Sequence, residues 1–306
     1  MLTILGPTAT GKTRIAAGVA SRIDAEIISA DSRQVFKRMD IGTGKDIEDY
    51  TYNGARIPYH LLDIVEPGSE FSVFDFLKHF YDAYNNITSR SKQVILCGGT
   101  GLYLEAALKG YELPNVPINE ELRSSLALLS KDQLIERLKT FKEIHNTTDV
   151  VDLDRLVRAI EIQTYLKTHT PKKTIEIPGI VIGIWFERST IRQRITNRLK
   201  QRLDNGMVEE VKRLIDEGVS VEMLAFYGLE YRYISQYLMG KITYNQLFES
   251  LNTAIHQFAK RQTTWFRRME KNGTVIHWID GYKPEDEKIE LIANVYKDTR
   301  FHDAKP

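Results

Sequence analysis

The sequence has very little cysteine and no long apolar segment. Cys97 is the only cysteine among 306 residues, so no disulfide can form within the chain, which is compatible with a reducing cytoplasm. It follows the apolar residues 94–96, and we expect a buried structural thiol there. The sequence shows no charged-then-apolar leader and no apolar run near about 18 residues, so we expect neither secretion nor a membrane span.

The chain also lacks a marked excess of either charge. Its formal net charge is +1, with 42 lysines and arginines against 41 aspartates and glutamates. This near balance hides an uneven distribution of charge along the chain. Apolar residues make up 42% of the sequence, and the length allows either one large domain or a core with a smaller lobe.

A glycine-rich motif stands near the start of the chain. Residues 6–13 have the sequence GPTATGKT, which fits the pattern G-x-x-x-x-G-K-[ST] at Gly6, Gly11, Lys12 and Thr13. In such a loop the backbone N–H groups surround a polyphosphate, the lysine neutralises charge and the hydroxyl binds Mg²⁺. Apolar residues 2–5 predict a buried strand before the loop, and residues 14–23 predict a helix whose N-terminus points at the anion. The motif predicts a phosphate site without indicating which phosphate compound is used.

Strands and helices alternate after this motif. Residues 25–30 form a second apolar strand that ends at Asp31, and residues 93–97 form another. This alternation predicts an α/β fold with a parallel sheet, in which the carboxyl ends of the strands share one edge with the phosphate loop. Asp31 is therefore expected near the phosphate, either in a metal shell or as a general base. Asp63, after two leucines, is a second candidate for the metal shell.

Two further segments combine a turn with the start of a helix. Ser72 and Asp75 fit a capping pattern for a helix that runs to about residue 89, so we expect Ser72 to be structural. Residues 98–103 (GGTGLY) follow a strand and precede a helix, which would supply a second set of backbone donors; a tight structural turn is the alternative. The turn-rich residues 40–45 (DIGTGK) indicate little by themselves.

The pattern changes between residues 116 and 173. The sequence becomes polar and helix-favouring there, with prolines at 114, 117 and 171, and predicts a helical insertion. Residues 179–186 (GIVIGIWF) then return as a core strand. Arg155 and Arg158 lie on neighbouring turns within the insertion, and a solvated helix face is the plainer interpretation of their charges.

Two later helices carry rows of cations. In the first, three arginines recur every four residues beside an apolar stripe of Ile191, Ile195 and Leu199. These are Arg194, Arg198 and Arg202. A salt-bridged surface is the alternative, but only scattered acids are near them in the sequence, so the row indicates an anionic partner.

The second row lies on the last predicted helix. Its apolar side is predicted to consist of Leu251, Ile255, Phe258, Trp265 and Met269. At about 100° per residue, five cations fall on the opposite side, namely Lys260, Arg261, Arg267, Arg268 and Lys271. Solvated charge is the usual explanation, but five cations without interleaved acids are typical of a surface that contacts a phosphate backbone. A strand over 275–279 and a charged tail from residue 280 are expected to follow.

Five segments together resemble a known family. They are GPTATGKT (6–13), DSRQVF (31–36), DIGT (40–43), GGTGLY (98–103) and KRQTTWFR (260–267), and they are similar to the successive motifs of bacterial tRNA dimethylallyltransferases, also called tRNA isopentenyltransferases. The segments occur in the family's order and extend over nearly the whole chain.

The resemblance implies a fold and a reaction. The fold is a P-loop NTPase-like parallel sheet flanked by helices, formed by residues 1–115 and 175–306, with a helical insertion over 116–174 that binds the anticodon stem. The reaction transfers a dimethylallyl group from dimethylallyl diphosphate to N6 of adenosine 37, beside the tRNA anticodon, and releases diphosphate. The implied partners are tRNA and dimethylallyl diphosphate, with Mg²⁺ as cofactor and no membrane, and we expect a monomer in the cytoplasm.

The resemblance also implies site residues, carried over by position. The catalytic set is Asp31 as the base on the adenine amine, Thr100, and Arg198 as a clamp on the diphosphate. The diphosphate is expected to bind Thr8, Ala9, Thr10, Gly11, Lys12 and Thr13, in a nucleotide-type loop that also includes Gly6 and Pro7, with Thr13 as the metal ligand. The residues expected to contact tRNA are Asp31, Ser32, Arg33, Gln34, Thr100, Asp154, Arg155, Arg158, Lys260, Arg261, Gln262 and Arg267.

The chain departs from the family pattern at several positions. Phe36 stands where tyrosine is usual, and Gly44 and Asp46 replace an alanine and a proline. Residues 227–230 (YGLE) stand where a Gly-Tyr followed by a basic residue is expected, so the resemblance carries no tRNA contact onto that loop. No paired Cys/His zinc module follows the basic helix, which excludes the longer eukaryotic form.

Three other functions share parts of this pattern. An adenylate isopentenyltransferase would act on free AMP, ADP or ATP, but the insertion and the basic helix argue against it. A P-loop small-molecule kinase would transfer the γ-phosphoryl group of ATP, and an RNA-binding NTP switch would bind RNA without prenyl transfer. The most useful experiment is incubation with dimethylallyl diphosphate, Mg²⁺ and either tRNA or AMP, followed by mass spectrometry of the adenosine product.

Overall fold

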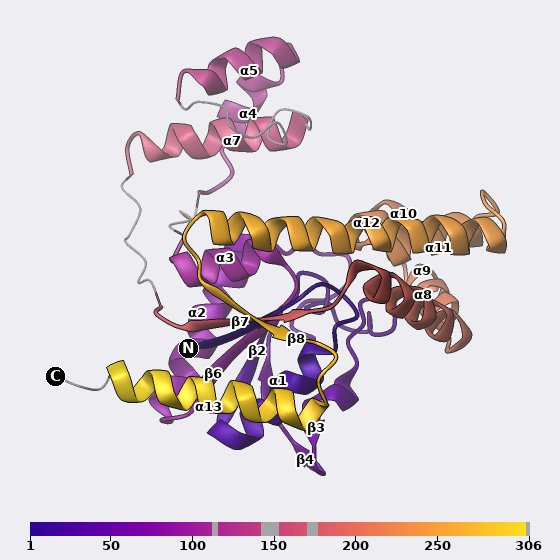
Figure 1. The fold of residues 1–306 in the computed structure, drawn as a ribbon. Coiled ribbons are helices and arrows are strands. Elements are labelled where there is room, and N and C mark those ends of the chain that lie inside the picture. The colour runs from indigo at the N-terminus through magenta and orange to yellow at the C-terminus, as the bar shows by residue number, and fades with distance from the viewer. Residues whose placement is uncertain (112–115, 142–152, 170–176, 304–306) are drawn as a thin grey trace. The chain divides into compact units, whose positions relative to one another are not determined.

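The computed structural model describes residues 1–111, 116–141, 153–169 and 177–303, and it divides the chain into two compact units. The first consists of residues 1–109 and 176–306, and the second of residues 110–175. The larger unit is built on a parallel sheet of six strands in the order β5-β2-β6-β1-β7-β8 (Figure 1). These strands are β1 (Leu2–Leu5), β2 (Ala25–Ala30), β5 (Tyr59–His60), β6 (Gln93–Gly98), β7 (Ile180–Trp185) and β8 (Ile276–Asp280).

The central strands are largely apolar because they are buried on both faces. β1 lies between β6 and β7, with Ile4 opposite Cys97 on one side and Ile182 on the other. All four residues of β1 and all six of β2 are buried. A two-stranded hairpin, β3 (Thr51–Tyr52) and β4 (Ala55–Arg56), follows the short 3-10 helix η1 (Ile47–Tyr50). The parallel sheet predicted from sequence is therefore confirmed.

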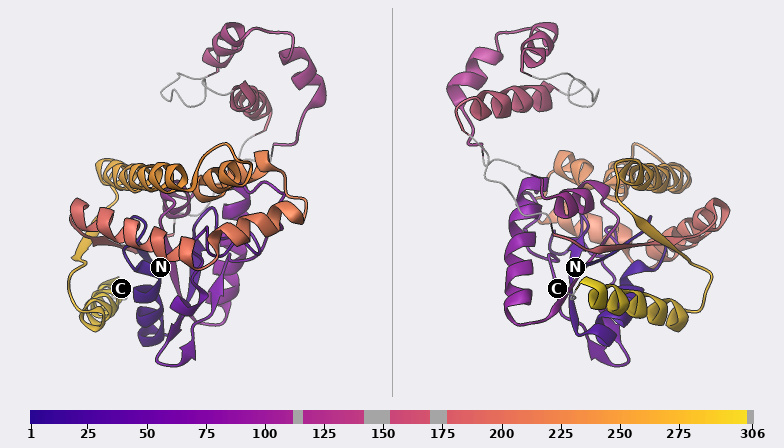
Figure 2. Two further views of the ribbon diagram at one scale, coloured as in Figure 1. Left: turned by 90° about the vertical axis from the view of Figure 1, so that its right-hand side faces the viewer. Right: turned by 60° about the vertical axis from the view of Figure 1, so that its left-hand side comes forward.

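Helices cover both faces of this sheet, with α1 and α13 on one side and α3 and α12 on the other (Figure 1). The helices of the larger unit are α1 (Lys12–Ile23), α2 (Val73–Ser89), α3 (Gly101–Lys109), α8 (Arg188–Asp204), α9 (Met207–Asp216), α10 (Val221–Tyr227), α11 (Leu229–Leu238), α12 (Tyr244–Lys271) and α13 (Glu285–Asp303). Helix α12 packs against α8 and α11, and two further views show α8 and α12 side by side (Figure 2). Among the described residues, every helix is too short or too polar to cross a bilayer.

Local capping signals in the sequence set several helix ends. Ser72 accepts a hydrogen bond from the Asp75 N–H, and the Asp75 side chain accepts one from the Ser72 N–H, so both predicted halves of the capping box are present. Thr243 and Gln246 form the same arrangement at the start of α12. Cys97 is buried, as predicted, and burial raises the pKa of its thiol to about 12.

The second unit contains three described helices. They are α4 (Glu120–Leu126), α5 (Lys131–Lys139) and α7 (Leu153–Leu166), and they enclose a small core of Leu126, Leu134, Leu138, Leu156 and Ile160. The helical character expected for this part of the sequence is present in these described segments. The insertion is predicted over residues 116–174, and residues 170–174 at its predicted end lie outside the described residues.

The structure corrects two expectations about the C-terminal part of the chain. The charged tail predicted from residue 280 is instead the helix α13, whose Ile289, Ile292 and Ala293 are buried in the core beside α1. The predicted apolar side of α12 is also partly wrong, because Phe258 is 38% exposed while Phe266 is fully buried. The packing stripe of α12 therefore lies a fraction of a turn from the predicted one.

Candidate active site

A cleft of about 880 Å³ opens at the carboxyl ends of β1, β2 and β6, within the larger unit. Most of the predicted site residues of this unit line it, namely Thr8, Ala9, Gly11, Lys12, Thr13, Asp31, Ser32, Arg33, Gln34, Thr100, Arg198, Arg261 and Gln262. Gly6, Pro7 and Thr10 belong to the same loop but do not line the cleft, and neither do Lys260 and Arg267 of α12. The cleft thus brings together residues from widely separated motifs.

The phosphate loop is shaped by an internal hydrogen bond and by a glycine at the start of α1. The Thr10 hydroxyl donates to the Pro7 carbonyl at 2.9 Å, and Gly11, with φ of 77°, precedes α1 in the left-handed conformation that favours glycine. Lys12 and Thr13 begin α1, so their side chains lie at the positive end of the helix dipole. Burial lowers the pKa of Lys12, whereas the nearby Asp31 carboxylate acts in the opposite direction.

Gln262 of α12 joins the phosphate loop to the glycine loop after β6. Its side-chain oxygen accepts from the Thr8 N–H at 2.9 Å, and its side-chain nitrogen donates to the Gly99 carbonyl at 2.9 Å. Sequence comparison with the family assigned this side chain to tRNA. In the structure Gln262 is buried, its amide is bonded at both ends to backbone groups, and it lines the cleft, while its contact with tRNA stays a prediction.

Asp31 and Thr100 are fixed at adjacent strand ends. The Arg33 N–H donates to Asp31 Oδ1 at 2.9 Å, and the Ser32 N–H donates to the Thr100 hydroxyl oxygen at 3.1 Å. A carboxylate has capacity for further acceptor contacts, and the Thr100 hydroxyl keeps its own proton to donate. Both side chains are therefore oriented by backbone groups while retaining hydrogen-bonding capacity in the cleft.

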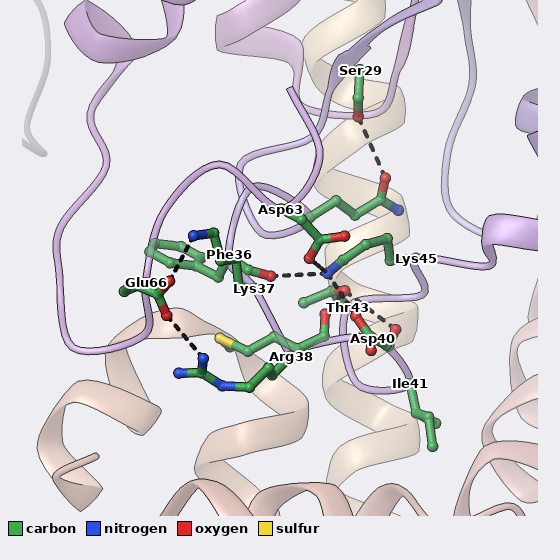
Figure 3. Close-up of polar contacts among 12 residues, drawn as sticks. Ser29, Phe36, Lys37, Arg38, Asp40, Ile41, Thr43, Lys45, Asp63 and Glu66 are labelled. Atoms are coloured by element: carbon green, nitrogen blue, oxygen red, sulfur yellow. Dashed lines mark hydrogen bonds and ion pairs between the residues drawn. The ribbon is translucent and has the colours of Figure 1, made fainter. Parts of the chain in front are cut away.

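Asp63, the second candidate for a metal shell, lies outside the cleft lining. Its carboxylate pairs with Lys45, whose ammonium also donates to the Phe36 carbonyl at 2.9 Å and to Asp40 at 2.6 Å (Figure 3). The Lys45 side chain is fully buried, and a buried charge requires such partners. Asp63 therefore neutralises a structural lysine, and the metal-shell hypothesis for it is wrong.

The arginine row of α8 faces the cleft and is paired. Arg194 donates from Nε to the Ala9 carbonyl at 2.7 Å, while Arg198 and Arg202 both donate to Asp46 Oδ2, at 2.6 and 3.3 Å. Arg198 and Arg202 thus do have an acidic partner, which the sequence did not indicate because Asp46 lies 152 residues before Arg198. Burial raises the pKa of Asp46, but the two arginines outweigh burial and hold it below its usual value.

The cationic side of α12 is less uniform than its sequence suggests. Arg268 pairs with Glu105 of α3 at 3.0 Å and lies 4.1 Å from the centre of the Trp265 ring, whose N–H also donates to Glu105. Arg261 lines the cleft. The interpretation of the row as cations without nearby acids is wrong for Arg268. All five residues are exposed, and Lys260, Arg267 and Lys271 lie outside the cleft lining.

The two arginines singled out in the smaller unit also differ. Arg158 pairs with the buried Glu161 and donates to the Val116 carbonyl at 2.7 Å, so the solvated-face interpretation is wrong for this residue. Arg123 pairs with the same carboxylate at 3.1 Å. Asp154 and Arg155 lie in the first turn of α7. Arg158 thus holds α7 against the segment that leads into α4.

Sequence reasoning missed several residues of the cleft. Asp49, Phe226 and Glu230 line it together with Trp265. Burial raises the pKa of the Asp49 and Glu230 carboxyl groups. In the sequence, this part of the cleft was indicated only by the departures from the family pattern at Asp46 and Glu230. A single acid in a polar segment forms no motif from which a role could be predicted.

Comparison with known proteins agrees with this geometry. The IPP transferase family model matches residues 34–269. A tRNA dimethylallyltransferase 2 from Phocaeicola vulgatus is 53% identical over 298 residues, which cover 96% of this chain and 97% of that one. A tRNA dimethylallyltransferase 1 from Geotalea daltonii is 54% identical over 285 residues, covering 92% and 91% of the two chains.

Solved structures agree as well. The tRNA isopentenylpyrophosphate transferase from Staphylococcus epidermidis has a TM-score of 0.70 at 31% identity and covers 97% of this chain and 98% of its own. A eukaryotic dimethylallyltransferase acting on tRNA has a TM-score of 0.78 at 20% identity, which shows the fold alone; it covers 100% of this chain and 80% of its own. With a matching family model over most of its length and relatives at more than 50% identity, the chain belongs to the IPP transferase family.

Proposed function

We propose that this chain is a tRNA dimethylallyltransferase that transfers the dimethylallyl group of dimethylallyl diphosphate to N6 of adenosine 37, beside the tRNA anticodon. The observation that carries the proposal is that one cleft holds both a phosphate loop and the Asp31 carboxylate. The phosphate loop can bind the diphosphate leaving group of the donor. The Asp31 carboxylate can accept the proton that the acceptor loses. Action as a monomer in the cytoplasm belongs to the same proposal.

The phosphate loop supports the departure of the leaving group. The bond between the allylic carbon and the diphosphate oxygen breaks, and negative charge accumulates on the diphosphate. Preorganised donors in a water-poor site stabilise such charge far better than water does. Lys12, Arg198 and the backbone N–H groups at the start of α1 are the donors that line the cleft.

Asp31 supports the attack of the base. The adenine amine is a poor nucleophile because its lone pair is drawn into the ring. As the new carbon–nitrogen bond forms, N6 must lose a proton, and a carboxylate held within hydrogen-bonding reach accepts it. Asp31 is held by the Arg33 N–H, which orients the carboxylate without consuming its remaining acceptor capacity.

The donor set fits a Mg²⁺ that arrives with the diphosphate. Over the described residues, no group of three or more His, Cys, Asp and Glu could hold a metal ion. Mg²⁺ needs only one or two protein oxygens when phosphate oxygens and water complete its shell, and the Thr13 hydroxyl in the cleft is such a ligand. When bound, the ion neutralises charge on the diphosphate.

The cations of α12 support an RNA acceptor. Lys260 and Arg267 are exposed on α12, whose Arg261 lines the cleft. Exposed cations of this kind contact the phosphate backbone of RNA, while the adenine must leave its stack to reach the diphosphate. Asp154 and Arg155 of the smaller unit are proposed to contact the anticodon stem. Arg158 is also proposed to contact the anticodon stem while it keeps its ion pair with Glu161.

The test compares two acceptors. The protein is incubated with dimethylallyl diphosphate and Mg²⁺ together with either unmodified tRNA or AMP, and the adenosine product is analysed by mass spectrometry. A mass increase on adenosine from the tRNA alone is expected, and it should be lost in Lys12→Ala. Prenylation of AMP with unmodified tRNA left unchanged would overturn the proposal.

A further inference from the structure

Arg202 is a largely buried cation that lines the cleft and shares its hydrogen-bonded carboxylate with a second arginine. Its side chain is only 15% exposed, and its acidic partner Asp46, 46% exposed, is shared with Arg198. Asp46 Oδ2 is closer to Arg198, at 2.6 Å, than to Arg202, at 3.3 Å. Two guanidinium groups thus donate to the same carboxylate oxygen beside the phosphate loop.

The backbone at Gly44 makes room for these two guanidinium groups. Gly44 has φ of 70°, a conformation that favours glycine, and a Cβ there would overlap Arg202 Nη2 and lie 3.0 Å from Arg198 Nη2. The Gly44 carbonyl accepts from the Gln34 side chain at 3.0 Å, which holds this part of the loop against the segment after β2. The position of the arginine pair therefore depends on glycine at residue 44.

Glu230 is the remaining acid beside Arg202. It lines the cleft, burial raises its pKa, and the charge of Arg202 acts in the opposite direction. Gly44, Asp46 and Glu230 are three of the positions at which the chain departs from the family pattern, and a basic residue is expected near position 230. All three departures surround the same guanidinium.

We propose that Arg202 is a second diphosphate-binding cation, which works beside Arg198 and supplies the positive charge that the family pattern places in the loop at residue 230. The inference rests on the proposed function, since it names a further residue for the same donor. Lys12, Arg198 and Arg202 line the cleft beside the phosphate loop, and the two arginines share the single oxygen Asp46 Oδ2, so an incoming diphosphate would give each guanidinium acceptor oxygens of its own. Binding replaces Asp46 as the partner of the two arginines.

The experiment measures binding of inorganic pyrophosphate in the presence of Mg²⁺ by calorimetry, without tRNA. Arg202→Met keeps the length of the side chain and removes the charge, and Arg202→Lys keeps a charge without the planar fork. A charge-assisted contact of this kind predicts that Arg202→Met weakens pyrophosphate binding by about 10- to 100-fold and that Arg202→Lys weakens it less.

The matched control is Arg192→Met, on the same helix but outside the cleft lining, which should leave the affinity within about twofold. Thermal unfolding checks that each variant is folded. A change below about twofold in folded Arg202→Met, or an equal loss in Arg192→Met, would overturn the inference. If the parent protein binds pyrophosphate but transfers no dimethylallyl group to tRNA, the proposed function fails while this assignment stands.

Discussion

At the scale of single residues, the site depends on carboxylates whose partners differ. Asp31 is oriented by one backbone N–H, Asp46 is engaged by two arginines, and Asp63 is engaged by Lys45. Asp31 and Asp63 both follow apolar residues in the sequence, so the sequence left these two as rivals. Their contacts separate them, because only an acid with free acceptor capacity in the cleft can take a proton from a substrate.

Asp31→Asn distinguishes the two roles of this side chain. Asparagine keeps the size and an acceptor oxygen but takes up no proton at neutral pH. If Asp31 is the general base, we expect near-normal binding of tRNA and pyrophosphate and a loss of about 10²–10⁴-fold in single-turnover rate. The measurement is single-turnover transfer at increasing Mg²⁺, and recovery of the rate at high Mg²⁺ would assign Asp31 to the metal shell instead.

At the scale of elements, the sequence predicted those strands, loops and helix ends that depend on neighbouring residues. The apolar runs of β1, β2 and β6, the phosphate loop and the Ser72 cap were all predictable because each depends on neighbouring residues. The pairing of Asp46 with Arg198 was not, since it joins segments 152 residues apart. Helix α13 was missed because its acids and lysines conceal the spacing of its buried Ile289 and Ile292.

Helix α12 is predicted to bind RNA through its exposed cations. Replacing Lys260 and Arg267 together by glutamine should reduce the slope of log affinity for tRNA against log salt by about two, because each cation is expected to neutralise one phosphate. Pyrophosphate binding should be unchanged because neither side chain lines the cleft. Filter binding over a range of salt concentrations provides the measurement.

The control for this experiment is Lys212→Gln. Lys212 is 63% exposed on α9 and pairs with Asp216, so its removal should leave the salt slope unchanged. An identical slope in the parent and the Lys260/Arg267 double variant would show that these cations are merely solvated.

At the scale of the whole molecule, the two units are stabilised by different means. The larger has an extensive core, whereas the smaller has only five buried apolar residues in its described core and a buried carboxylate at their edge. Burial raises the pKa of Glu161, but hydrogen bonds from Arg123, the Asn119 N–H and Arg158 outweigh burial and lower it to about 2. The stability of the smaller unit should therefore depend on this group.

The pH dependence follows from the direction of the shift. Because the folded pKa of Glu161 lies below its ordinary value of 4.5, its stabilising effect is fully present above pH 4.5 and is lost as the pH falls toward 2. Glu161→Gln should cost about 1–3 kcal/mol near neutral pH and much less in acid. Hydrogen exchange of α4, α5 and α7 in the full chain, corrected for intrinsic rates, measures this effect.

Glu121→Gln is the control, because Glu121 is exposed in α4 of the same unit. It should leave the protection of these helices unchanged at every pH. If the difference in hydrogen-exchange protection between Glu161→Gln and the parent stayed constant across the acid range, the stabilising role of the Glu161 carboxylate would be contradicted.

The C-terminal helix is predicted to be essential to the larger core. Ile289 is fully buried, and a Cβ on Gly18 of α1 would overlap its side chain, so the two helices meet with no space between them. Ile289→Ala should lower the free energy of unfolding by about 2–5 kcal/mol. Leu291→Ala, on the same helix but 40% exposed, should change it by less than about 0.5 kcal/mol. Equal effects in urea unfolding would place α13 outside the cooperative core.

Gln262 is expected to couple the binding of the two substrates. One amide on α12 bonds the phosphate loop and the glycine loop at once, so any RNA that immobilises α12 also immobilises the backbone that holds the donor. Thermodynamic linkage then requires each substrate to raise the affinity of the other by the same factor. The affinity for pyrophosphate should therefore rise when tRNA is present. Gln262→Leu should bring the ratio of the affinities with and without tRNA close to one. Gln257→Leu, at an exposed position of the same helix, should leave this ratio unchanged. In this enzyme, heterotropic cooperativity would thus depend on one amide that joins two loops of the cleft.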